Sequence, residues 1–121
     1  MGGSILLVED HEDTANAFAR MLRRDGYVVT IANSATDALA LCAAHMFDLL
    51  ICDLELPDGD GSQILKAARD SRPRTQGIVV SGHDDFGNRD KARAAGFLQC
   101  FVKPVDYVAL RQTVAQVLAR E

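Results

Sequence analysis

Cysteine is scarce in this sequence, and its three copies lie far apart. Cys42, Cys52 and Cys100 are an odd number and form no CxxC pair, a pattern that favours neither a disulfide framework nor a zinc site. We interpret them as reduced thiols in the core of a cytosolic protein. The cysteine content therefore argues against a small secreted protein that disulfides hold together.

Basic clusters and long apolar runs are also missing. The N-terminal apolar run, Ile5 to Val8, has no basic leader and is far shorter than the roughly 20 residues that span a membrane. With 13 Lys and Arg against 17 Asp and Glu, the formal net charge is -4. Such a chain lacks the electrostatic footprint of a nucleic-acid-binding protein. We expect a cytoplasmic domain with no membrane segment and no direct nucleic-acid contact, whose partner is a protein or a small ligand.

The length of 121 residues fits one domain, which we place at 1–121. The opening Met1-Gly2-Gly3-Ser4 is compatible with a cloning remnant, in which case the natural protein is larger. Within the domain, apolar runs typical of strands alternate with stretches of helical periodicity. The runs are Ile5 to Val8, Tyr27 to Ile31, Leu49 to Cys52, Gly77 to Val80, and Leu98 to Val102. The helical stretches are about 13–25, one from 34, 62–70, 85–95, and one from 106 to the chain end.

Several residues predict how these helices begin, end and pack. Gly26 and Gly96 are expected to end the first and fourth helices, and Ser34 and Asp106 to cap the second and fifth. The residues predicted to face the core are Ala15, Phe18, Ala19, Leu22, Ala35, Ala38, Leu39, Cys42, Ile64, Leu65, Ala68, Val108, Leu110, Val114 and Val117. Strands joined by crossover helices form an open parallel α/β sheet with helices on both faces. Ligands bind such sheets at the carboxyl ends of the strands.

Polar residues end four of the five strand-like runs. Glu9 and Asp10 follow the first, Asp53 the third, Ser81 the fourth and Lys103 the fifth. Three converging carboxylates repel one another and require a cation, and carboxylate oxygens in a solvated crevice suit Mg²⁺. Together with the ion, the lysine and the hydroxyl can neutralise phosphoryl oxygens. This arrangement predicts that Asp53 is a nucleophile toward phosphorus.

The segments VEDHED, ICDLELPDGDG, VVSG and FVKPVD, in this order and spacing, resemble the receiver domain of two-component response regulators. LPDGDG and FVKPVD also resemble receivers fused to hybrid histidine kinases. The resemblance covers essentially the whole chain. It implies a flavodoxin-like sheet of order 2-1-3-4-5, and phosphoryl transfer from a histidine kinase or a histidine phosphotransfer protein. The domain is then a phosphorylated signalling module whose only catalysis is its own phosphorylation and slow dephosphorylation.

The resemblance also implies a role for each residue of the site. Asp53 is the phosphoacceptor, Ser81 hydrogen-bonds the phosphoryl group and Lys103 pairs with it. The Mg²⁺ ligands are Asp10 and Asp53 directly, the backbone carbonyl of Glu55, and Glu9 mostly through water. Lys103-Pro104 is expected as a cis peptide.

Two positions depart from the family pattern. Cys100 stands where an aromatic residue commonly couples to the switch hydroxyl, and His83 lies two residues after Ser81. Phe101 cannot replace that ring, because successive strand residues point to opposite faces. By the same period, Cys52 points away from Asp53 and is expected in the core.

The remaining acidic residues and histidines have simpler interpretations. We interpret Asp58 and Asp60 as turn formers, and His11 as an exposed loop residue without a metal-binding companion. The whole chain also has alternative functions: a flavodoxin-type electron carrier, although the acidic VEDHED suits an FMN phosphate poorly, an aspartyl-phosphate phosphatase, or a degenerate receiver that only binds partners.

Overall fold

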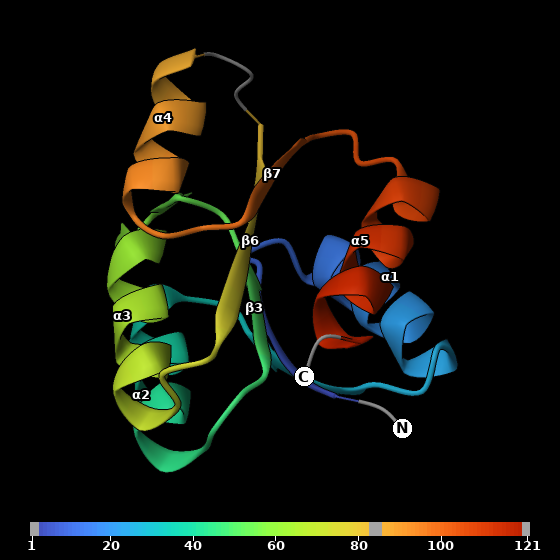
Figure 1. The fold of residues 1–121 in the computed structure, drawn as a ribbon, viewed down its shortest axis with the longest axis horizontal. Helices are drawn as coiled ribbons and strands as arrows, with labels where there is room; N and C mark the ends of the chain where they lie inside the picture. Colours follow the sequence, from blue (N-terminus) through green and yellow to red (C-terminus); the bar gives the residue numbers. More distant parts are fainter. Residues whose placement is uncertain (1–2, 83–85, 120–121) are drawn as a thin grey trace.

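The computed structural model describes residues 3–82 and 86–119, with the backbone alone at 55 and 86–88. Figure 1 shows a central sheet with helices on both faces. The elements in chain order are β1 (Ser4–Val8), α1 (Glu12–Arg24), β2 (Val28–Ala32), α2 (Ala35–Ala44), β3 (Leu49–Cys52), β4 (Glu55–Leu56), β5 (Gly59–Asp60), α3 (Gly61–Ser71), β6 (Gln76–Ser81), α4 (Phe86–Ala94), β7 (Gln99–Val102) and α5 (Tyr107–Ala119). Among the described residues, no helix is long and apolar enough to cross a bilayer.

The main sheet has the order β2-β1-β3-β6-β7, and every neighbouring pair is parallel. The two-residue strands β4 and β5 form a separate antiparallel hairpin. Without that hairpin the order is 2-1-3-4-5. Helices α1 and α5 cover one face, and α2, α3 and α4 cover the other (Figure 1). The predicted flavodoxin-like α/β fold is therefore confirmed.

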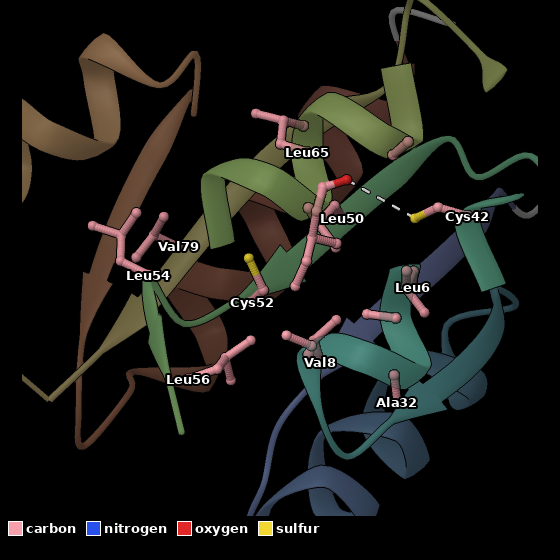
Figure 2. Packing of buried hydrophobic residues seen from close by; sticks show 14 of the residues in the cluster. Leu6, Val8, Ala32, Cys42, Leu50, Cys52, Leu54, Leu56, Leu65 and Val79 are labelled. Atoms are coloured by element: carbon pink, nitrogen blue, oxygen red, sulfur yellow. Dashed lines mark hydrogen bonds between the residues drawn. The ribbon is translucent and has the colours of Figure 1, made fainter. Parts of the chain in front are cut away.

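Alternate strand residues enter two separate cores. Leu6 and Val8 belong to the cluster under α2 and α3, which we call the α2–α3 core, whereas Ile5 and Leu7 belong to the cluster under α1 and α5. Figure 2 shows the α2–α3 core from close by. All four residues of β3 are buried, as its unbroken apolar run predicts. The carboxyl end of β3 is consequently fixed by packing on both faces.

The helix boundary signals are confirmed. Gly26 and Gly96 follow α1 and α4 with φ of 96° each, in the left-handed region that favours glycine. Ser34 Oγ accepts a hydrogen bond from the backbone N–H of Asp37, and Asp106 Oδ1 accepts from the first turn of α5. These local contacts need only residues close in sequence, which explains why the sequence predicts them.

The prediction that Val108 and Leu39 are buried in the core is wrong. Val108 is 62% exposed and Leu39 is 37% exposed. The buried residues of α5 are Leu110, Val114 and Val117, and a helix of 3.6 residues per turn places a residue two positions before Leu110 on the opposite side. Leu39 is likewise one position away from the buried Ala38 and therefore about 100° around the helix.

The β4–β5 hairpin corrects the interpretation of Asp58 and Asp60 as turn formers only. Asp60 caps α3, because its side chain accepts a hydrogen bond from the Ser62 N–H. Asp58 caps α2 from outside that helix: its carboxylate accepts from Ala35 N at 2.8 Å, Thr36 N at 3.0 Å and Thr36 Oγ1 at 2.8 Å. The hairpin behind Asp53 is thus tied to the start of α2.

We expect Asp58→Asn to lower the free energy of unfolding at neutral pH. The hydrogen bond from the Ala35 N–H, followed by those from Thr36, lowers the pKa of Asp58. A lowered folded-state pKa stabilises the fold above the unfolded pKa, and this stabilisation is lost as pH falls through the folded value. In urea denaturation, the difference between wild type and variant should be present at pH 7 and should shrink in acid. Asp70→Asn, at an exposed carboxylate of α3, is the control; a difference independent of pH would contradict the assignment.

Candidate functional site

Glu9 stands at the carboxyl end of β1 and is held in place by its backbone. Its N–H donates to Ala32 O at 3.0 Å, and its carbonyl accepts from Asn33 Nδ2 at 3.3 Å. The residue is only 4% exposed. A buried carboxylate is costly unless it is paired, so this position requires a cation. Asn33, a residue that the sequence did not single out, fixes the strand end from β2.

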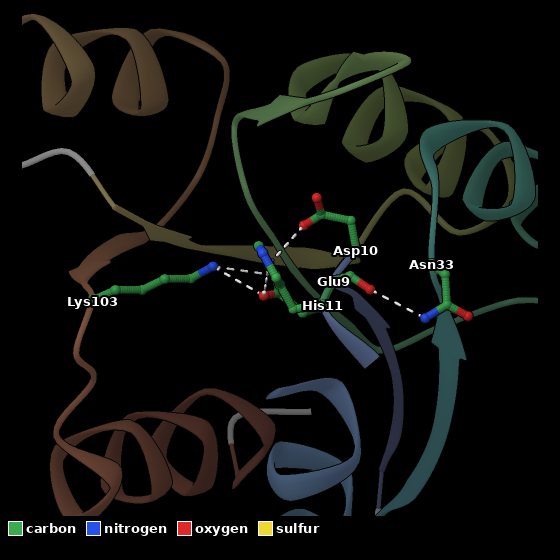
Figure 3. A network of polar contacts seen from close by, with 5 residues as sticks. All are labelled: Glu9, Asp10, His11, Asn33 and Lys103. Atoms are coloured by element: carbon green, nitrogen blue, oxygen red, sulfur yellow. Dashed lines mark hydrogen bonds and ion pairs between the residues drawn. The ribbon is translucent and has the colours of Figure 1, made fainter. Parts of the chain in front are cut away.

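Lys103 is the cation that meets Glu9. Its Nζ donates to Glu9 Oε1 at 3.0 Å and to Oε2 at 3.3 Å (Figure 3). Its backbone N–H donates to Ser81 O at 2.8 Å, and the Lys103-Pro104 peptide is cis, as the resemblance implies. The sequence predicted Glu9 and Lys103 at one edge of the sheet, but it did not predict their direct ion pair, which joins residues 94 positions apart.

The strand register places Asp53 and Ser81 at the same edge. Cys52 pairs with Val8, so Asp53 follows β3 beside the position where Glu9 follows β1. Ser81 is the last residue of β6, is 1% exposed, and pairs with Val102 directly before Lys103. Asp53 is partly exposed. The four strand ends therefore converge as the sequence predicts.

The chain turns back tightly behind Asp53. The Gly61 N–H donates to Leu54 O at 2.8 Å, and a Cβ on Gly61 would lie 2.5 Å from the carbonyl oxygen of Asp53. Cys52 points into the α2–α3 core, as its strand period predicts. Burial, followed by the charge of Asp53, raises the pKa of the Cys52 thiol. The protonated thiol is a poor nucleophile at neutral pH, so of these two neighbouring side chains the Asp53 carboxylate is the better candidate for a nucleophile.

A histidine lies beside the acidic residues Glu9 and Asp10 at the end of β1. His11 Nδ1 lies 3.3 Å from Asp10 Oδ1 and 3.4 Å from Glu9 Oε1, and the candidate ligand atoms of the three residues lie within 4.8 Å of one another. The expectation that His11 has no metal-binding companion is therefore wrong. The sequence could have indicated this cluster, because Glu9, Asp10 and His11 are consecutive and the turn between a strand and the following helix can bring successive side chains close together.

The other predicted site positions are placed as follows. The backbone of Glu55 begins β4, while its side chain and His83 lie outside the described residues. Cys100 packs against the α2–α3 core and Phe101 against the opposite core, as the strand period predicts. Cys100 is only partly buried, so it is not the core thiol that the sequence analysis expected.

Comparison with known proteins agrees with this geometry. Residues 5–115 match the family model of the response regulator receiver domain. Over 116 residues the chain is 34% identical to the alginate biosynthesis transcriptional regulatory protein AlgB of Pseudomonas aeruginosa, covering 96% of this chain and 26% of AlgB. The transcriptional regulatory proteins ZraR of Salmonella typhimurium and Escherichia coli are also matched over only 26% of their length, so the chain spans about a quarter of these relatives.

Solved structures give the same result. The signal receiver domain of an HD domain-containing protein from Pseudomonas fluorescens Pf-5 superimposes with a TM-score of 0.88 at 30% identity, covering 99% of this chain and 97% of that one. A response regulator from Burkholderia pseudomallei, with a phosphorylated aspartic acid, calcium ion and citrate, gives 0.82 at 25% identity, covering 98% and 72%. The match over nearly the whole chain and the converging strand ends show that this chain belongs to the response regulator receiver domains.

Proposed function

We propose that this domain accepts a phosphoryl group on Asp53 from the phosphohistidine of a histidine kinase or a histidine phosphotransfer protein, in a Mg²⁺-dependent reaction. The observation that carries the proposal is the convergence of Asp53, Ser81, Lys103 and the Glu9–Asp10 pair at one sheet edge. By the same proposal the domain works in the cytoplasm and switches partner interactions when phosphorylated. By this proposal it is not a turnover enzyme, because the phosphoryl group is transferred to a residue of the domain itself and not to a separate substrate.

The donor groups of the site fit Mg²⁺. The carboxylates of Asp10 and Asp53, the carbonyl of Glu55 and the nearby Glu9 are hard oxygen donors, which this ion prefers while it keeps several waters. Asp10 is exposed and Asp53 partly exposed, so water can complete the coordination. The bound ion supplies positive charge beside the phosphoryl oxygens.

The remaining residues have separate roles in the transfer. A carboxylate oxygen of Asp53 attacks phosphorus, and the bond from phosphorus to the donor nitrogen breaks, with the electron pair left on nitrogen. The Ser81 hydroxyl and the Lys103 ammonium supply hydrogen bonds to phosphoryl oxygens. Lys103 has three N–H donors, so it can contact a phosphoryl oxygen as well as Glu9.

Intact-mass spectrometry tests the proposal. Incubation with acetyl phosphate and Mg²⁺ should add the mass of one phosphoryl group, and EDTA should prevent the addition. Hydroxylamine should remove the group, since it cleaves acyl phosphates and leaves phosphoserine intact. A stable, hydroxylamine-resistant product, or addition of the phosphoryl group to the same extent in the presence of EDTA, would contradict the proposal.

Cys100 leads to a prediction about how the structure of the phosphorylated domain differs from that of the free domain. A thiol is much smaller than the aromatic ring common at this position, so we expect activation to move Ser81 and the following loop but to reshape the surface of β7 and α5 little. Amide chemical shifts of the free and beryllofluoride-bound domain measure this. Changes along β7 and α5 as large as those near Ser81, and insensitive to Cys100→Ala, would show that the switch needs no ring.

A further inference from the structure

His11 differs from an ordinary helix-start residue in how its side chain is used. It is the N-cap of α1, yet its ring makes no capping hydrogen bond. Instead, Nδ1 faces the carboxylates of Asp10 and Glu9, while the ring is 74% exposed (Figure 3). One nitrogen and two oxygens of different residues therefore converge beside the proposed Mg²⁺ position.

The spacing of these atoms fits a small metal ion. With bonds of about 2.0–2.2 Å, neighbouring ligands of a tetrahedral ion are about 3.3–3.6 Å apart. The distances from His11 Nδ1 to the two carboxylate oxygens are 3.3 and 3.4 Å. The imidazole can thus join the carboxylates around one ion without a large movement.

The chemistry of the donor atoms decides which ion binds more tightly when the imidazole is a ligand. Imidazole nitrogen suits Zn²⁺, Co²⁺, Ni²⁺ and Cu²⁺, whereas Mg²⁺ takes oxygen ligands and water. A site of carboxylates alone would favour these ions less than a site that also contains imidazole. Because Lys103 Nζ already contacts Glu9 Oε1 at 3.0 Å, Asp10 and His11 are the two ligands with the least competition.

We propose that His11 supplies a nitrogen ligand to this site, so that with Asp10, and with Glu9 as a third donor, the domain binds a divalent transition-metal ion such as Zn²⁺ or Co²⁺ more tightly than Mg²⁺. This inference rests on the proposed function, since it extends the same metal site. Mg²⁺ binding does not involve His11. The two classes of ion therefore compete for Asp10 but depend differently on the imidazole.

Binding measurements on the intact chain test the inference. Calorimetric titrations with Zn²⁺ and Mg²⁺ compare wild type, His11→Asn, and the control His45→Asn at the exposed C-cap of α2. Residues that only support a metal ligand typically change affinity by about 10–100-fold, so losing the ligand should weaken Zn²⁺ binding at least about tenfold. His11→Asn should leave Mg²⁺ affinity unchanged, His45→Asn should change neither, and Asp10→Asn should weaken both.

Two spectroscopic readouts identify the ligand atom. Long-range ¹H–¹⁵N spectra should show Zn²⁺ shifting the ring nitrogens of His11, and Mg²⁺ leaving them in place. Co²⁺ should give no thiolate charge-transfer bands, which separates this site from Cys100. Zn²⁺ affinity equal in wild type and His11→Asn, equal losses for both ions, or thiolate bands that account for the bound Co²⁺ would overturn the inference.

The same experiments separate the inference from the proposed function. If Zn²⁺ binding depends on His11 but Asp53 takes no phosphoryl group, only the proposed function fails. If Mg²⁺ supports phosphorylation and Zn²⁺ binding ignores His11, only this inference fails.

Discussion

Asp53→Asn is expected to abolish Mg²⁺-dependent labelling by acetyl phosphate while the domain remains folded. The amide has no anionic oxygen to attack phosphorus. Among the described carboxylates, only that of Asp53 follows β3, the strand that lies between β1 with Glu9 at its end and β6 with Ser81 at its end. The change also removes one of three repelling carboxylates, so the free energy of unfolding should be unchanged or slightly higher. Radiolabelled acetyl phosphate measures the first effect, and urea denaturation the second.

Asp58→Asn is the matched control for that experiment. Asp58 lies five positions further along the same turn, but its carboxylate contacts Ala35 and Thr36. This variant should still be labelled. Labelling of Asp53→Asn at the wild-type level would show that another residue is the acceptor.

Gly61→Ala is expected to destabilise the domain and to slow labelling. The new Cβ would lie 2.5 Å from Asp53 O, 3.0 Å from Cys52 Sγ and 3.2 Å from Leu54 Cα, and two of these atoms are backbone. Overpacking of this kind costs about 1–3 kcal/mol, which exceeds the roughly 0.5–1 kcal/mol that alanine gains over glycine in a helix. Relief of the clash must move the chain that positions the nucleophile. Urea denaturation and the labelling rate measure the two effects.

Gly82→Ala is the control for stability. A Cβ at Gly82 would meet no atom of the described residues within 4 Å, and its backbone lacks the positive φ of Gly26 and Gly96. Its free energy of unfolding should stay close to wild type. Equal stability of Gly61→Ala and wild type would mean that the turn behind Asp53 is looser than described.

The parts of this fold that sequence patterns predict are those set by residues close together in the chain. The β3 run from Leu49 to Cys52 predicts a strand covered on both faces, and alternation along β7 packs Cys100 and Phe101 against different cores. Strand ends predict the site because parallel strands with crossover helices all present their carboxyl ends at one edge. The position of Asp53 beside Glu9 follows from that topology.

Contacts between distant residues were beyond the reach of these patterns. The Asp58 carboxylate contacts α2 across 23 positions, and Lys103 reaches Glu9 across 94, because the tertiary fold alone brings them together. The exposure of Val108 and Leu39 has a different cause: both are apolar residues outside the buried face of their helices, and apolar character alone does not place a residue on that face. The convergence of His11 with its neighbours depends on side-chain direction at one turn.

Borohydride trapping followed by peptide mass spectrometry tests the central claim most directly. The domain is treated with acetyl phosphate and Mg²⁺, and borohydride then reduces any aspartyl phosphate to homoserine. We expect homoserine at position 53 alone, with Asp10, Asp58 and Asp60 unmodified and no product when EDTA is present. Homoserine at any of those other positions, or none in a protein that has gained a phosphoryl group, would contradict the assignment of Asp53 as the phosphoacceptor.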